Sequence, residues 1–402
     1  MLSVADASAR TRALVNRLAA ENVPLDEAAG RILASSVVAP RPLPGFDNSA
    51  MDGFAARSAD LPATLAVSAH IAAGQAPSAL APGTAARIMT GAQLPADADT
   101  VVMFEDAQAD GDSVTLPASS VGTNVRRAGE DIAPGATALV AGALLGPGEI
   151  GLAAALGFHV LDVTRRPVVA IITTGDELVD VATPPGPGQL VDSSAYALSA
   201  YITDAGGTPR YLGIARDRPE DIRALLDEAL TCDVVLTTGG VSAGDHDHVR
   251  TALAAAGVTL DFWKVAMKPG KPLAAGTALR PSWKHAEVVP VFALPGNPVS
   301  SLVAFELFVR PALLTMLGAD RVDRPRAPVV LTDGYRKPTG RAHFVRAWLR
   351  RDGERLIATL HPRQGSAMLT SLVGIDALIE IDAALGEIVP GGTAPALLLR
   401  AV

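Results

Sequence analysis

Between Arg166 and Gly318 the sequence alternates apolar runs with runs of helical periodicity, and this alternation limits the possible folds more than any other feature. Apolar runs predict buried strands at 168–173, 209–214, 233–237, 260–265 and 288–294. The intervening periodicity predicts helices at 193–205, 219–230, 246–256 and 299–317. Strands that alternate with helices of this length form βαβ units, so we expect a central α/β domain with a mostly parallel sheet.

The segments on either side have a different pattern. Residues 54–143 contain short alternating runs separated by Gly, Pro and Asp clusters, which is typical of β structure, and short strands return at 329–331, 347–349, 356–359, 377–381 and 396–399. Two apolar stripes predict helical structure in the first 35 residues, and the second stripe runs from Leu25 to Leu33. A further short helix is predicted at 147–157. We therefore expect a multidomain α/β plus β protein with a helical stalk or linker region (1–43 and 141–165), an inserted β-rich domain (44–140), an α/β domain (166–322) and a C-terminal β domain (323–402).

Composition excludes several classes of protein. The 402 residues carry 34 Lys and Arg against 42 Asp and Glu, a net charge of −8, which argues against broad binding to nucleic acid or to a membrane surface. A hydrophobic fraction of 49% excludes a disordered chain. The single cysteine, Cys232, permits no intrachain disulfide and is expected to be a small buried residue. Charges scattered through the first 20 residues leave no signal-peptide core, so we expect a soluble, cytoplasmic protein.

Polar, glycine-rich segments follow the predicted strands of the α/β domain, at 173–177, 215–217, 237–248, 268–272 and 294–300. Because ligands bind outside the carboxyl ends of strands in open parallel sheets, these segments should converge on one edge. Their glycines allow backbone amides to approach an anion, and Lys268 and Lys271 add positive charge. Glu177, Asp217 and Asp247 add carboxylates. This combination suits a phosphorylated ligand with a bridging Mg²⁺.

Familiar short motifs also occur, but their contexts do not support them. The G-x-S-x-G match at 240–244 lacks a helix starting directly after the serine, and no His-Gly-Gly run is present for an oxyanion hole. The G-x-G-x-x-G match at 146–151 places a proline in the tight turn, and Lys271 is followed by Pro272 where a phosphate loop needs Ser or Thr. The acidic and histidine residues at 245–248 favour a solvated helix start over a four-ligand metal site. The residues alone therefore indicate a phosphoanion-binding α/β enzyme with two β satellites.

A set of longer motifs, spread over nearly the whole chain, resembles the molybdopterin molybdenumtransferases, the family that includes the gephyrin E domain. The motifs are PGFDNSAMDG at 44–53, RIMTGA at 87–92, NVRRAGED at 124–131, TTGDE at 173–177, TGGVS at 238–242, KPGKP at 268–272 and LPGNPVS at 294–300. Departures are few: Phe54 stands where the family commonly has Tyr, His246 and His248 are not expected, and HPRQGS at 361–366 is a looser match.

The resemblance implies an enzyme that hydrolyses adenylated molybdopterin and inserts molybdate with Mg²⁺ present, yielding molybdenum cofactor and AMP. It implies catalytic roles for Glu177, Asp217, Asp247, Lys268 and Lys271, with the three acids near the pyrophosphate and its Mg²⁺. The positions implied to bind substrate are Asp52, Thr90, Asp131, Ser242, Lys264, Pro295, Pro298, Ser300, Arg346 and Ser366.

The resemblance also implies a homodimer whose cleft combines the first β domain of one subunit with the α/β and C-terminal domains of the other. Transient contacts with other cofactor-biosynthesis proteins and with apo-molybdoenzymes are expected. Two alternatives stay open: a non-catalytic molybdopterin-binding or scaffold protein of the same fold, and a paralogue that inserts tungstate. The presence of the motif lysines and acids favours an active enzyme, whereas sequence does not separate molybdate from tungstate.

Overall fold

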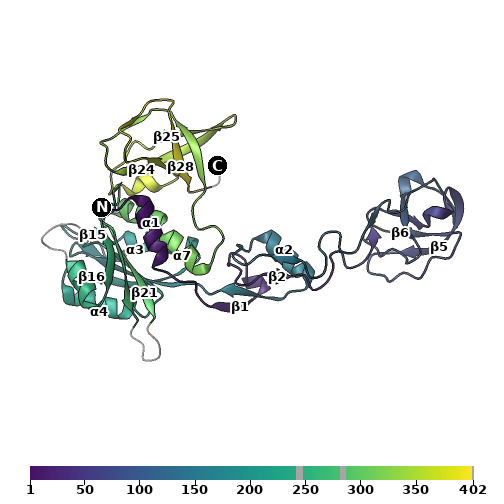
Figure 1. Cartoon of the computed structure of the whole chain (residues 1–402), viewed down its shortest axis with the longest axis horizontal. Helices are drawn as coiled ribbons and strands as arrows, with labels where there is room; N and C mark the ends of the chain where they lie inside the picture. Colours follow the sequence, from purple (N-terminus) through teal and green to yellow (C-terminus); the bar gives the residue numbers. More distant parts are fainter. Residues whose placement is uncertain (241–247, 281–286, 401–402) are drawn as a thin grey trace. The chain divides into compact units, whose positions relative to one another are not determined.

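The computed structural model describes residues 1–240, 248–280 and 287–400 (Figure 1). The chain divides into two units, each with its own internal packing. Unit 1 comprises Met1–Glu21, Gly30–Ala34 and Val163–Val402, and unit 2 comprises Asn22–Ala29 and Ser35–Asp162. The predicted α/β plus β composition is present, while the four predicted domain boundaries stay a prediction.

The α/β sheet of unit 1 has the strand order β16-β13-β17-β21-β20-β18. The strands are β13 (Val168–Thr174), β16 (Thr208–Ala215), β17 (Val234–Thr238), β18 (Thr259–Trp263), β20 (Ala274–Leu279) and β21 (Val288–Leu294). The pairs β13–β16, β13–β17 and β17–β21 are parallel, whereas β20 pairs antiparallel with both β21 and β18. Strand β20 was not predicted, because its Ala- and Gly-rich sequence has little of the β-branched and aromatic character typical of strands.

Helices cover both faces of this sheet. They are α3 (Ser194–Asp204), α4 (Pro219–Ala229), α5 (His248–Ala255), α6 (Pro298–Ala304) and α7 (Arg310–Leu317), the last two joined by the π-helical turn Phe305–Val309. Alternate residues of β13 enter different apolar clusters: Val169 and Ile171 pack with α3, α6 and α7, and Ala170 and Ile172 with α4 and α5. The run Pro298–Leu317 is long and apolar enough to span a membrane, but 89% of its most apolar window is buried, as in a core helix.

The first 35 residues are only partly helical. Helix α1 (Val4–Ala13) packs against α7, and its amino end is capped by Ser3, whose Oγ accepts a hydrogen bond from the Asp6 amide. The predicted helix from Leu25 to Leu33 is wrong. The chain instead forms β1 (Ala20–Pro24), paired with β12 (Val160–Thr164), followed by a single 3₁₀ turn at Leu25–Glu27. Gly30, with a φ of 74°, then takes a left-handed conformation that a continuous helix cannot contain.

Unit 2 contains a six-stranded mixed sheet with the order β7-β4-β6-β5-β9-β8. Its strands are β4 (Gly53–Ala56), β5 (Ala63–Ile71), β6 (Thr84–Ile88), β7 (Thr100–Met103), β8 (Gln108–Asp110) and β9 (Ser113–Leu116). Phe54 and Ala56 belong to one apolar cluster and Ala55 to another, so both faces of the sheet are covered. Short pairs join β2 (Val37–Val38) to β11 (Thr137–Leu139) and β3 (Asn48–Ser49) to β10 (Val125–Arg126), and the predicted helix at 147–157 is confirmed as α2 (Pro147–Leu156).

The C-terminal strands form a sheet that closes on itself. In the ring β24-β25-β22-β28-β26 each strand pairs with two neighbours, because β24 also pairs with β26. The strands are β22 (Arg326–Leu331), β24 (Ala342–Asp352), β25 (Arg355–Leu360), β26 (Ala377–Ile381) and β28 (Thr393–Leu398), which confirms the five predicted short strands. A sixth strand, β19 (Met267–Lys268), joins β24 from the α/β segment and pairs Lys268 with His343. Shorter pairs join β14 (Leu178–Val179) to β15 (Leu190–Val191) and β23 (Tyr335–Arg336) to β27 (Glu387–Ile388).

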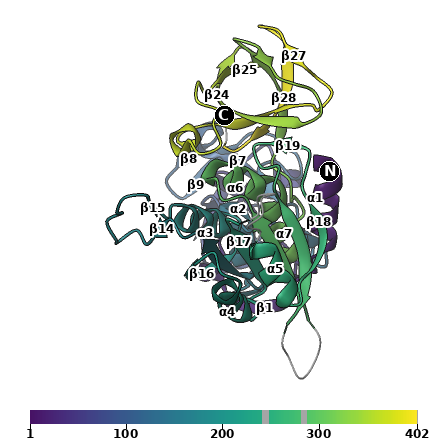
Figure 2. The ribbon, with the colours of Figure 1, turned by 90° about the vertical axis from the view of Figure 1, so that its left-hand side faces the viewer.

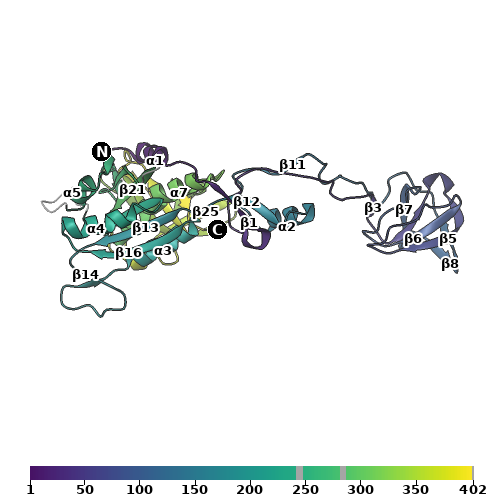
Figure 3. The same cartoon turned by 90° about the horizontal axis from the view of Figure 1, so that it is seen from below.

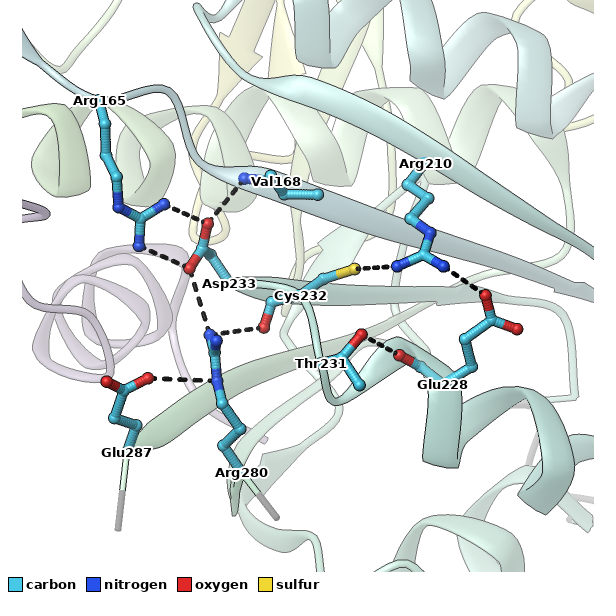
Figure 4. A network of polar contacts seen from close by, with 9 residues as sticks. All are labelled: Arg165, Val168, Arg210, Glu228, Thr231, Cys232, Asp233, Arg280 and Glu287. Carbon is cyan, nitrogen blue, oxygen red and sulfur yellow. Dashed lines mark hydrogen bonds and ion pairs between the residues drawn. The ribbon is translucent and has the colours of Figure 1, made fainter. Parts of the chain in front are cut away.

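An ionic network holds the amino edge of the α/β sheet together (Figure 4). Asp233, immediately before β17, is 8% exposed and accepts hydrogen bonds from Arg165 at 2.6 and 2.8 Å and from the Val168 amide at 2.9 Å. Arg280 adds a contact at 3.2 Å. Burial alone would raise the pKa of Asp233, but these donors outweigh it and hold that pKa below its usual range. Cys232 is free and buried, as predicted.

Candidate functional site

Two adjoining cavities lie at the carboxyl edge of the α/β sheet. The first has a volume of about 680 Å³; its lining includes Glu177, Asp192 and Asp217, and we call it the acidic cavity. The second has a volume of about 580 Å³; its lining includes Lys268, Lys271 and Arg341, and we call it the cationic cavity. Both are lined by Pro272, Asn297 and Ser300, so the two spaces share a wall. The predicted convergence of strand-end segments on one edge is confirmed for their described residues.

The acidic cavity lies where the strand order reverses, between β13 and the strands on its two sides. Gly239, with a φ of 104°, allows the ends of β13 and β17 to approach, because a Cβ there would come within 2.3 Å of the Thr174 carbonyl oxygen. The ends of β13 and β16 are joined by the Gly175 amide, which donates to Ala215 O at 3.2 Å. A carboxylate oxygen of Asp176 accepts from the Asp217 amide at 3.3 Å. These contacts bring Glu177 and Asp217 to the wall of one cavity.

The donor set of the acidic cavity is compatible with Mg²⁺ but does not enclose one. Within residues 1–240, 248–280 and 287–400, no group of three or more His, Cys, Asp and Glu side chains is arranged to hold a metal. Mg²⁺, however, is commonly bound through one or two carboxylates together with substrate phosphates and water. Glu177 and Asp217 on one cavity wall meet that requirement. Asp247, the third predicted acid, lies outside the described residues and stays a prediction.

The cationic cavity is formed where the α/β segment meets the C-terminal sheet. Strand β19 places Lys268 beside β24, and Arg341 immediately precedes that strand. Three cations therefore line a space that also contains Ser300, Ser366, Asn297 and Gln364, and none of the described residues that line it is a carboxylate. Cations and hydroxyl donors without a competing acid are the environment that a tetrahedral oxyanion requires.

A loop from the C-terminal sheet closes one side of the cationic cavity. The side-chain amide of Asn297 donates to Ser366 Oγ at 3.2 Å, and the backbone amide of Val299 donates to Ser366 O at 3.1 Å. Ser366 is thereby attached to the start of α6, which also carries Ser300. Pro295 and Pro298 line the acidic cavity on the other side of this segment. These predicted residues are brought together, although their contact with substrate stays a prediction.

Arg346 lies behind this loop rather than on a cavity wall. Its side chain is 1% exposed, and its guanidinium donates to Ser371 Oγ and to the carbonyls of Arg363 and Gly365, each at 3.1 Å. Burial lowers the pKa of Arg346 to about 10. The geometry gives Arg346 a supporting position, and its predicted substrate contact stays a prediction.

Three predicted residues of unit 2 and one of unit 1, Lys264, are not among the described residues that line the two cavities. Lys264 occupies a left-handed turn between β18 and β19, with a φ of 80°. In unit 2, Asp52 accepts hydrogen bonds from the Thr90 amide at 2.6 Å and from Thr90 Oγ1 at 2.7 Å, and these bonds lower the pKa of Asp52. Asp131 is exposed in the same unit. Ser242 lies outside the described residues, so its role stays a prediction.

Among the charged residues that line these cavities, Arg341 and Asp192 were not predicted as site residues. Arg341 belongs to the segment Gly340-Arg341-Ala342, and only its position just before an apolar strand could have marked it. Asp192 precedes a predicted helix, where an aspartate indicates no more than a helix cap. Its place in the acidic cavity depends on the pairing of β14 with β15, which local sequence does not reveal.

Comparison with known proteins gives consistent matches along the chain. Residues 2–157 match the MoeA N-terminal region (domain I and II), residues 170–315 a molybdopterin binding domain, and residues 328–399 the MoeA C-terminal region (domain IV). Molybdopterin molybdenumtransferase 2 of Mycobacterium tuberculosis is 39% identical over 384 residues, covering 92% of each chain. Molybdopterin molybdenumtransferase of Bacillus subtilis is 38% identical over 387 residues, covering 93% of this chain and 86% of that one. A crystal structure of the molybdopterin biosynthesis MoeA protein of Pyrococcus horikoshii superposes with a TM-score of 0.85 at 29% identity, covering 99% of this chain and 100% of that one.

Proposed function

This chain belongs to the molybdopterin molybdenumtransferase family, and from that premise we propose how its two cavities divide the reaction. It is a transferase of molybdenum cofactor biosynthesis. The proposed substrates are adenylated molybdopterin and molybdate, and the proposed products are molybdenum cofactor and AMP. The observation that carries this proposal is the adjacency of a cationic cavity to an acidic one, with Pro272, Asn297 and Ser300 on both.

The cationic cavity is the proposed site of molybdate. Lys268, Lys271 and Arg341 supply positive charge, and Ser300 and Ser366 supply hydroxyl donors. Charge-assisted hydrogen bonds to an anion are stronger than neutral ones, so three cations favour a doubly charged oxyanion over water. The dithiolene end of the pterin substrate would lie next to this cavity, where the metal is transferred.

The acidic cavity is the proposed site of the adenylate. Glu177 and Asp217 there would repel the phosphates of the nucleotide unless a cation lay between them. We assign Mg²⁺ to Glu177 and Asp217, with Asp247 as a further candidate. When bound, Mg²⁺ would neutralise phosphate charge during release of AMP. Gly175, Gly239 and Gly240 also line this cavity, and without side chains they would let backbone amides approach the same phosphates.

A homodimer with a shared cleft is also part of the proposal. The two cavities belong to unit 1, whereas Asp52, Thr90 and Asp131 belong to unit 2. Two sets of polar residues in different units are consistent with a two-fold arrangement in which the β-rich domain of one subunit completes the cleft of the other. We further propose a cytoplasmic enzyme that transiently contacts other cofactor-biosynthesis proteins and apo-molybdoenzymes.

Two alternative functions differ from this proposal in what the protein would bind or turn over. A scaffold protein of the same fold would bind molybdopterin without turnover, and a paralogue could use tungstate, which has the same charge and tetrahedral shape as molybdate. The lysines and acids that line the cavities support catalysis over scaffolding.

The test is a reconstitution assay. The purified chain is incubated with adenylated molybdopterin, Mg²⁺ and either molybdate or tungstate, and released AMP and activation of an apo-molybdoenzyme are measured. We expect AMP release and activation with molybdate. Binding of the pterin substrate without AMP release would support the scaffold alternative instead, and turnover with tungstate alone would identify a tungstate enzyme.

A further inference from the structure

An arm of the α/β domain forms one wall of the acidic cavity. It consists of residues 178–191, in which β14 and β15 pair in parallel, Leu178 with Leu190 and Val179 with Val191. The segment between these strands projects from the body of the α/β domain in two perpendicular views (Figures 2 and 3). Leu178, Leu190 and Val191 line the acidic cavity, so the arm contributes an apolar surface beside its carboxylates.

A buried carboxylate fixes the end of this arm. Asp192 directly follows β15 and is 2% exposed. Its Oδ1 accepts hydrogen bonds from the Ser194 and Ala195 amides at 3.0 and 3.2 Å, at the start of α3. Its Oδ2 accepts from the Tyr211 hydroxyl at 2.9 Å. The Asp192 amide donates to Val179 O at 2.9 Å, so the same residue also contacts the first strand of the arm.

Tyr211 connects this carboxylate to the sheet. It lies on β16, and its hydroxyl is 3.4 Å from Thr173 Oγ1 on β13. Burial raises the pKa of Tyr211, so the hydroxyl keeps its proton and remains a donor to Asp192. The arm is therefore held to α3, β13 and β16 through one carboxylate and one phenol.

The first strand of the arm directly follows the predicted acid Glu177. The Leu190 amide donates to Glu177 O at 2.8 Å, so the second strand of the arm holds the backbone of Glu177. A shift of β15 would move this carbonyl and the Glu177 side chain with it. The hydrogen bonds of Asp192 lie one residue beyond β15 and oppose that shift.

We infer that Asp192 and Tyr211 are positioning residues that hold the arm against the acidic cavity and so orient Glu177 and the apolar wall toward the nucleotide part of the substrate. This inference rests on the proposed function, because it assigns the acidic cavity to the adenylate. If Asp192 served only as a cap for α3, its loss would lower stability and leave the kinetic constants of the folded enzyme unchanged.

Tyr211→Phe is the sharpest test, because it removes one hydroxyl and keeps the ring. We expect the KM for adenylated molybdopterin to rise about five- to tenfold, the effect of losing one hydrogen bond, with a fall in kcat. The KM for molybdate should change less than about twofold, since the cationic cavity lies outside the arm. Asp192→Asn should change the same constants in the same direction and further, because it perturbs both the cap and the Tyr211 contact.

Ser199→Ala is the matched control. It also removes one hydroxyl from this region, where Ser199 Oγ donates to Ala195 O at 2.8 Å within α3. We expect it to leave all three kinetic constants unchanged. If the wild-type enzyme turns over and Tyr211→Phe has the kinetic constants of Ser199→Ala, the positioning role is wrong. If the wild type itself releases no AMP, the proposed function fails instead. Should Asp192→Asn not fold, the Tyr211→Phe comparison still decides.

Discussion

Lys268 and Lys271 are the side chains on which oxyanion binding should depend most directly. Both line the cationic cavity, whose described lining has no carboxylate to neutralise them. Replacing either with Ala should weaken molybdate binding by about 1.5–3 kcal/mol, the range for a lost charged hydrogen bond, or roughly 10- to 100-fold. Equilibrium binding of molybdate measures this loss. Arg355→Ala removes an exposed cation from β25 and serves as the control; wild-type affinity in the double lysine variant would rule out the assignment.

His343 should make stability depend on pH. It is 4% exposed, its Nδ1 lies 3.0 Å from the Tyr335 hydroxyl, and burial together with Lys268, Lys337 and Arg341 lowers its pKa to about 4. In the unfolded chain the His343 imidazole takes up a proton near pH 6.5, whereas in the folded chain it takes one up only near pH 4. Stability is therefore full above pH 6.5 and falls as the pH drops toward 4, by about 2–3 kcal/mol at pH 4.5.

Urea denaturation at pH 7 and pH 4.5 measures this effect. His343→Gln cannot take up the proton, so it should lose less stability than the wild type over the same interval. Equal losses in the two proteins would show that other groups account for the acid sensitivity.

At the scale of elements, the two edges of the α/β sheet have different roles. The carboxyl edge carries the cavities, and the amino edge carries the network of Asp233 with Arg165 and Arg280 (Figure 4). Asp233→Asn should lower the free energy of unfolding by about 2–3 kcal/mol, less than for a fully buried pair because Arg165 is 37% exposed. Because the pKa of Asp233 is lowered, its contribution is present above the ordinary carboxyl pKa of 3.8 and is lost as the pH falls further.

Urea denaturation and steady-state kinetics together check this prediction. The kinetic constants of the folded Asp233→Asn variant should match those of the wild type. A large fall in kcat without loss of stability would contradict the separation of the two edges.

Local sequence predicted the elements whose signal is local. The parallel strands were predicted because strands buried on both faces are continuous apolar runs in the sequence. The convergence of the segments that follow them was predicted because parallel strands end at the same edge of the sheet. The pairing of β19 with β24 was not predictable, because a two-residue strand carries no periodicity and its partner lies far along the chain. The buried position of Arg346 was missed because arginine is normally exposed, and only the carbonyls of a distant loop make its burial possible.

At the scale of the whole molecule, a cleft shared between subunits predicts complementation. Asp52→Ala disrupts the Asp52–Thr90 pair of unit 2, and Lys271→Ala removes a cation from unit 1. Each variant should be inactive alone. A heterodimer of the two should regain activity, because one of its two clefts then contains neither lesion. AMP release by mixed dimers of confirmed mass measures this, and an inactive heterodimer or an active monomer would rule out the shared cleft.

The assignment of molybdate to the cationic cavity and of the adenylate to the acidic cavity is tested most directly by locating bound molybdate. Crystals of the enzyme grown with saturating molybdate, measured at the molybdenum absorption edge, would reveal the metal by its anomalous scattering. We expect a molybdenum peak in the cationic cavity. The molybdate oxygens should then lie within hydrogen-bonding distance, about 3 Å, of the side-chain nitrogens of Lys268, Lys271 and Arg341. A peak in the acidic cavity or elsewhere, with the cationic cavity free of molybdenum, would contradict the assignment.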